Sequence, residues 1–195
     1  MRRFLSVLAL MSIPLLAPVS AQADGGGIKF DQVPKGSAFY YKSIGDGITW
    51  VEYYGGVENG RHVMRKYFLQ GGKVKPEPFQ IAYFDPAGRL VRLDKLLFKS
   101  RHSWEPFACW SSNAAHCSHL HTVVETATGK VSARHKNSFE IKSKRNGRTV
   151  VRHPSGNRIT TYYKLDDRNL ILESKPAKPV LDKGYRLVKQ GVPQQ

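Results

Sequence analysis

Cysteine is scarce in this chain: there are two cysteines among 195 residues. Two cysteines exclude a disulfide-dense scaffold and a zinc site built from four thiolates. Acidic residues are also few, 15 against 31 lysines and arginines, so the chain carries a formal charge of +16. Disorder is excluded despite this charge, because 41% of the residues are hydrophobic and 11% are aromatic. The length predicts one domain, or at most two small ones.

Catalytic motifs and long helices are missing as well. No G-x-S-x-G, H-E-x-x-H or phosphate-binding loop occurs in the sequence. Beyond residue 23, no long stretch places apolar residues at helical spacing, and no apolar run is long enough to span a bilayer. These absences favour a non-enzymatic function. A small basic hydrolase that acts on a polyanion is the alternative.

Residues 1–23 have the layout of a secretory signal peptide. Arg2 and Arg3 precede an apolar stretch, and Ala21 and Ala23 form an A-x-A cleavage site. An uncleaved membrane anchor is the alternative. We expect cleavage near Ala23, a periplasmic or secreted protein, and a single β-rich domain over residues 24–195. The leader contributes two arginines and no acid, so this domain carries 29 basic and 15 acidic residues, a charge of +14.

The rest of the chain has the period-two pattern of strands, with turn residues at short intervals. From Val131 to Lys142, Phe139 and Ile141 alternate with Glu140 and Lys142, which is typical of an antiparallel strand with one buried face. The sequence predicts an all-β fold, an antiparallel meander of about nine to eleven strands. The meander is curled into a barrel or split into a sandwich, and a barrel removes the exposed pairing edges.

Residues 84–90, Phe-Asp-Pro-Ala-Gly-Arg-Leu, form one distinct turn motif. The motif resembles a unit of the YD-repeat family, in which a Tyr-Asp-x-x-Gly-Arg-Leu hairpin recurs. Here phenylalanine replaces the tyrosine. The resemblance implies a hairpin that turns near Gly88, and it implies no function.

Cys109 and Cys117 enclose seven residues rich in serine, asparagine and alanine. In an exported protein such a pair predicts a disulfide, here one that staples a hairpin. Closing so short a loop stabilises a fold by roughly 2–3 kcal/mol in the chain-entropy model.

Histidines gather beside the second cysteine. His119 and His121 are two apart, so on a strand they share a face and form a two-nitrogen chelate suited to zinc or copper. His102 is a third candidate ligand if its segment pairs with theirs. Surface histidines on an exposed strand are the alternative interpretation.

A basic band covers residues 130–158, with one acid, Glu140, among its lysines and arginines. If this segment is a hairpin, many of these charges gather on its solvent face and attract polyanions. Lipopolysaccharide and acidic glycans are the partners that a cell envelope offers. The alternative is a solvated face whose lysines prevent edge pairing. The candidate anion-binding residues are Lys136, Lys142, Lys144, Arg145, Arg148 and Arg152.

Aromatic residues are concentrated in the first strands, among them Phe39, Tyr41, Trp50 and Tyr54. Such rings either line a ligand cavity inside a barrel or fill an ordinary core. The sequence as a whole therefore predicts an exported β-protein that binds an anionic or apolar envelope component, with metal binding by the histidines as an alternative.

Overall fold

A computed structural model of the chain describes residues 26–144, 146–153, 159–177 and 184–191. The predicted signal peptide and Arg145 lie outside the described residues. Export and cleavage near Ala23 therefore stay predictions. Within the described part, no helix is long and apolar enough to cross a membrane.

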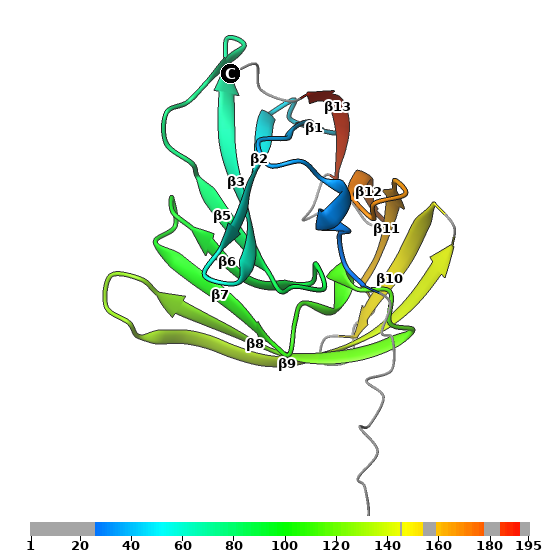
Figure 1. Cartoon of the computed structure of the whole chain (residues 1–195). Helices are drawn as coiled ribbons and strands as arrows, with labels where there is room; N and C mark the ends of the chain where they lie inside the picture. Colours follow the sequence, from blue (N-terminus) through cyan, green and yellow to red (C-terminus); the bar gives the residue numbers. More distant parts are fainter. Residues whose placement is uncertain (1–25, 145, 154–158, 178–183, 192–195) are drawn as a thin grey trace, which may run out of the picture.

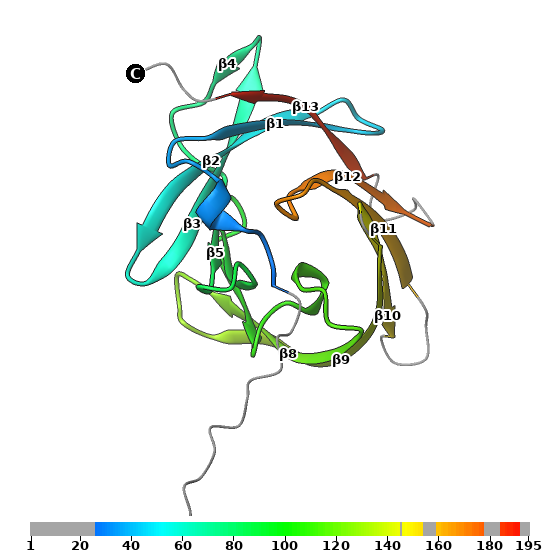
Figure 2. The ribbon, with the colours of Figure 1, turned by 45° about the vertical axis from the view of Figure 1, so that its right-hand side comes forward.

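One antiparallel sheet closes on itself (Figures 1 and 2). Neighbouring strands pair in chain order, and the last strand, β13, pairs with β1. Twelve strands form the ring, because β4 pairs only with β3 and extends it as a short hairpin. The strands are β1 (Ala38–Ser43), β2 (Thr49–Glu58), β3 (Arg61–Gln70), β4 (Lys73–Val74), β5 (Gln80–Phe84), β6 (Leu90–Lys95), β7 (Ser100–Glu105), β8 (His116–Glu125), β9 (Val131–Lys144), β10 (Gly147–His153), β11 (Ile159–Leu165), β12 (Ile171–Pro176) and β13 (Tyr185–Gly191).

The predicted antiparallel meander is confirmed, and of the two shapes it is the barrel. The described residues form 13 strands, more than the expected nine to eleven, and β7 and β8 are the hairpin expected around the cysteine pair. β7 and β8 carry polar residues and histidines on the face that points into the barrel, so their sequences lack the apolar alternation of a half-buried strand.

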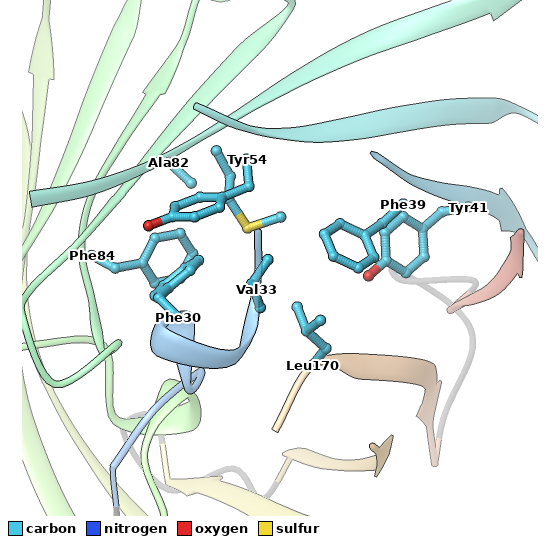
Figure 3. Close-up of a cluster of buried hydrophobic side chains, with 9 residues drawn as sticks. Phe30, Val33, Phe39, Tyr41, Tyr54, Ala82, Phe84 and Leu170 are labelled. Atoms are coloured by element: carbon cyan, nitrogen blue, oxygen red, sulfur yellow. The ribbon is translucent and has the colours of Figure 1, made fainter. Parts of the chain in front are cut away.

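The N-terminal segment plugs the barrel. The short 3₁₀ helix η1 (Phe30–Gln32) lies inside the ring of strands (Figure 2). The Phe30 ring stacks on Tyr54 and His62, with centroids 4.8 and 4.4 Å away. Figure 3 shows Phe30 and Val33 among side chains from several strands and from the turn before β12, which are Phe39, Tyr41, Tyr54, Ala82, Phe84 and Leu170.

The hairpin at residues 84–90 seats this plug. Gly88 adopts a φ of +73°, and the Ile28 amide donates to its carbonyl oxygen at 2.9 Å. A Cβ atom at Gly88 would lie 1.9 Å from the Ile28 oxygen, so only glycine allows the approach. Asp85 fixes the turn by accepting hydrogen bonds from the Arg89 backbone and guanidinium. The predicted hairpin is thus also a docking point for the N-terminus.

The up-and-down topology gives the barrel two different ends. The turns at residues 59–60, 86–88, 106–115 and 166–169 lie at the end that the N-terminal segment and the disulfide loop fill; we call it the plugged end. The turns at 44–48, 71–79, 96–99 and 126–130 lie at the opposite end, which we call the pocket end.

Candidate functional site

A pocket of about 420 Å³ opens at the pocket end of the barrel. Its walls come from strands far apart in the sequence, β1, β2, β3, β5 and β13, and from the loops between them. Four aromatic rings and four polar side chains, including the acid Asp46 and the cation Lys66, share the lining. The lining residues are Ser43, Asp46, Ile48, Trp50, Lys66, Phe68, Phe79, Gln80, Gly184 and Tyr185.

The aromatic walls are held in place by their own contacts. Phe68 and Phe79 stack with centroids 3.9 Å apart. Trp50 meets Tyr185 edge to face at 5.5 Å. Behind them, the buried Tyr41 ring contacts both Trp50 and Tyr185 at 5.6 Å. Burial is the main cause that raises the pKa of Tyr41 well above its usual value, so its phenol stays neutral.

Glu52 organises the polar side of the pocket from beneath. Its Oε1 accepts a hydrogen bond from Trp50 Nε1 at 3.0 Å and forms an ion pair with Lys66 Nζ at 2.7 Å. Glu52 is itself buried, so this ion pair is largely shielded from solvent. The result is a pre-formed site with apolar walls and a neutralised cation at its base, the composition typical of small-molecule pockets.

The three histidines predicted as metal ligands all project into the barrel. His102 Nδ1 and His121 Nε2 lie 3.0 Å apart, and the His121 ring stacks on Trp104 at 5.2 Å. The strand that carries His102, β7, therefore does pair with β8, which carries His121, and this pairing was the condition for His102 as a third ligand. His135, which the sequence analysis did not single out, is the Cα partner of His121 on β9.

His119 stands apart from this pair. Its Nδ1 accepts a hydrogen bond from the Cys109 amide at 3.1 Å, and only 2% of the residue is exposed. The proton of the neutral ring is therefore on Nε2, which has no hydrogen-bond partner among the described residues. Trp110 and Phe139 surround the ring. His119 is thus a buried support of the disulfide loop.

Burial keeps these imidazoles uncharged. It lowers the pKa of His102 to about 4, with smaller contributions from Lys95 and His121. It lowers the pKa of His119 to about 4 as well, with smaller contributions from His121 and Arg152. Burial also lowers the pKa of His121. Neutral imidazoles are the form that binds metals. Within the described ranges, no three histidine, cysteine or acidic side chains are already grouped as a metal site.

The predicted disulfide between Cys109 and Cys117 is present. It joins the 3₁₀ helix η2 (Cys109–Ser111) to β8. The loop that it closes folds over the plugged end, where Cys109 packs with Phe139, Ile141 and Val150.

The predicted anion-binding band divides between two faces of the sheet. Lys136, Lys142 and Lys144 are exposed. Arg148 and Arg152 pair with Ser143 and Phe139, so they share the inward face of the hairpin. Arg148 is 5% exposed and cannot belong to a surface patch. Arg148 therefore lies outside any solvent-facing band, because strand alternation, not charge, decides which way a side chain points.

Arg148 has a structural task instead. Its Nη1 donates to the Trp110 and Ser112 carbonyl oxygens at 2.9 and 2.7 Å. Both carbonyls belong to the disulfide loop. Burial lowers the pKa of Arg148 to about 10, so the guanidinium stays charged at neutral pH.

A second hollow, of about 440 Å³, lies next to the disulfide on the outer side of β8, β9 and β10. Within it, His153 Nε2 is 3.2 Å from Glu140 Oε1, and Ser118 and Ser138 line the same hollow. A histidine beside a carboxylate in a cleft is the feature that the hydrolase alternative requires. Both side chains are at least 40% exposed, so the pair lies in solvent-like surroundings.

Comparisons with known proteins gave no match, whether with family models, with curated protein sequences or with solved structures. Function has to be inferred from the geometry of this chain.

Proposed function

We propose that this protein is exported to the cell envelope and that its barrel binds an amphiphilic envelope molecule, without catalysing a reaction. The observation that carries the proposal is the aromatic-walled pocket at the pocket end. Trp50, Phe68, Phe79 and Tyr185 offer ring faces to an acyl or aromatic group. Ser43, Gln80 and the ion-paired Lys66 offer hydrogen bonds to a polar head.

Removal of one wall should weaken this binding about tenfold. Phe79→Ala deletes a ring that is stacked on Phe68 and is only half-buried, so the barrel should still fold. An aromatic contact of this kind contributes about 1.4 kcal/mol, which corresponds to a tenfold change in Kd. The measurement is a fluorescence titration with N-phenyl-1-naphthylamine, followed by displacement with laurate.

Tyr162→Ala is the matched control, because Tyr162 is a half-exposed ring on β11 that does not line the pocket. Equal probe affinity in F79A and Y162A would contradict the proposal. So would a probe signal that laurate does not displace.

Metal binding is a second candidate function, favoured by the contact between His102 and His121. Two nitrogens bound to one tetrahedral zinc ion at ~2.05 Å lie roughly 3.3 Å apart. The observed nitrogen separation is 3.0 Å, so a small movement would let an ion replace the shared proton. His135 is the nearest third histidine along the register.

Zinc titration by calorimetry tests this candidate. We expect one ion per chain, with binding abolished in His121→Gln and weakened at least about tenfold in His135→Gln, since one ligand of three is lost. His153→Gln, at an exposed histidine, is the control. The absence of saturable heat below millimolar zinc would end the metal interpretation.

A further inference from the structure

Exposed apolar side chains are unevenly distributed over the barrel. Eight of the eleven large hydrophobic residues exposed in the described chain lie at the pocket end or in the strand starts next to it. Scattered single residues of this kind are ordinary, but a concentration at one end marks an interaction surface. The eight residues are Ile44, Ile48, Val74, Leu96, Leu97, Phe98, Val131 and Ile159.

The turn between β6 and β7 is the most exposed part of this surface. Leu96, Leu97 and Phe98 follow one another there, and Phe98 is 76% exposed. The turn is held rigidly, because the Phe98 and Lys99 amides donate to the Lys95 and Leu96 carbonyls. Three successive apolar side chains are thus presented to solvent on a hydrogen-bonded turn, a costly arrangement for a surface that stays in water.

This turn is continuous with the wall of the pocket. The Leu96 amide donates to the Phe79 carbonyl at 2.9 Å, and Phe79 is one of the pocket's four rings. On the other side, the Thr126 amide donates to the Lys99 carbonyl at 2.7 Å, which ties in the turn before Val131. A molecule that leaves an apolar layer at this turn would therefore reach the pocket without crossing the barrel wall.

Positive charge surrounds the same end. The segments 42–48, 73–79, 95–99 and 125–130 contain six lysines and three acids. The lysines are Lys42, Lys73, Lys75, Lys95, Lys99 and Lys130, and the acids are Asp46, Glu77 and Glu125. Lysines beside exposed apolar residues complement a surface with an anionic outer layer and an apolar interior. A bilayer that contains anionic lipids has that composition.

We propose that the pocket end docks on an anionic lipid bilayer, with Leu97 and Phe98 inserted among the lipids and the lysines on their headgroups. This inference rests on the proposed ligand pocket and names the source of its ligand: an amphiphile that enters from the bilayer. In this arrangement the pocket end contacts the membrane and the plugged end faces water.

Vesicle co-sedimentation of the purified protein tests the proposal, with phosphatidylcholine vesicles that contain or lack phosphatidylglycerol. We expect binding to the anionic vesicles that weakens with salt. The double variant L97S/F98S should lower the partition coefficient at least about tenfold, since two apolar side chains lose their insertion. Both residues are more than 60% exposed, so the fold should tolerate the change.

Two matched controls lie away from the pocket end. Val57→Ser removes an apolar side chain that is 61% exposed at the plugged end, and it should leave vesicle binding unchanged. Arg61→Glu reverses an exposed charge beside the turn at residues 59–60 of the plugged end, and Lys99→Glu reverses an exposed charge in the apolar turn. Only Lys99→Glu should weaken binding to anionic vesicles.

The outcome separates docking from the pocket itself. L97S/F98S should keep its affinity for N-phenyl-1-naphthylamine in solution, and F79A should still bind vesicles. Probe binding without vesicle binding in the wild type would overturn docking and leave the pocket proposal standing. Docking would also be overturned if V57S and L97S/F98S bound vesicles equally. It would likewise be overturned if light scattering showed a dimer that L97S/F98S abolishes and the wild type did not bind vesicles.

Discussion

Replacing Arg148 with alanine should lower the free energy of unfolding by about 3 kcal/mol. The change leaves two carbonyl oxygens, those of Trp110 and Ser112, without the guanidinium that donates to both. A buried carbonyl without a donor costs about 1–3 kcal/mol. Removing a buried charge returns part of its desolvation cost, which keeps the total below the sum of two such losses. Urea unfolding at pH 7, with the disulfide intact, measures the difference.

Arg134→Ala is the matched control, because Arg134 is an exposed arginine on the neighbouring strand β9. It should change stability by less than about 0.5 kcal/mol. Arg148→Lys should fall between the two, since the ammonium keeps the positive charge but does not place a donor where Nη1 donates to both carbonyl oxygens. Equal stability of R148A and R134A would show that Arg148 does not hold the disulfide loop.

Arg148 also shows where charge patterns mislead. Six candidate cations around Glu140 look like one basic band in the sequence, and the pairing of β9 with β10 is indeed formed. Alternation along β10 nevertheless sends Arg148 and Arg152 inward while the lysines of β9 face solvent. The apolar residues Phe139 and Ile141 of β9 mark the inner face of the β9–β10 hairpin. Both arginines lie across from this face, so the register alone predicts that they point inward.

The fold was predictable where each strand carries its own signal. Val131 to Lys142 alternates cleanly, and the turn at Gly88 has its geometry in the sequence. β7 and β8 carry a weaker signal, because their inward positions hold His102, Trp104 and His121 in place of aliphatic residues. Barrel closure depends on the pairing of β13 with β1, a contact between the two ends of the domain that no local pattern reports.

The candidate site was predictable only in part, for a related reason. His119 and His121 do share a face, as the period of a strand requires. Their partners differ, because the Cys109 amide donates to His119 whereas the His102 ring contacts His121. The pocket draws on five strands between β1 and β13, so its rings become neighbours only when the barrel closes. Nothing in the sequence distinguished Trp50 in the pocket from Tyr41 in the core behind it.

Acidification should destabilise the barrel between pH 6.5 and pH 4, before most carboxylates titrate. The pKa of His119 is about 4 in the folded chain and about 6.5 when unfolded. Well above pH 6.5, His119 is unprotonated in both the folded and the unfolded chain, so it lowers the free energy of unfolding by nothing. Below it, the unfolded chain binds a proton that the folded chain does not, so the free energy of unfolding falls until the folded pKa is reached.

For His119 alone the loss by pH 4.5 is roughly 2.5 kcal/mol. His102 and His121 act in the same direction, with their contributions reduced by partial exposure to solvent. Urea unfolding in a chelator-containing buffer, at pH 7 and at pH 4.5, measures the total. Gln at position 119 keeps an acceptor for the Cys109 amide but does not titrate, so H119Q should lose about 2.5 kcal/mol less than the wild type over this range.

His153→Gln is the control variant for the loss of a histidine side chain, because His153 is exposed and lies outside the buried group. A parallel fall in H119Q and wild type would mean that His119 takes up its proton in the folded state, and therefore that the ring is less enclosed by Trp110 and Phe139 than their contacts imply. The hydrogen bond from the Cys109 amide to His119 Nδ1 predicts that the folded ring stays unprotonated, since a proton on Nδ1 would place two donors against each other.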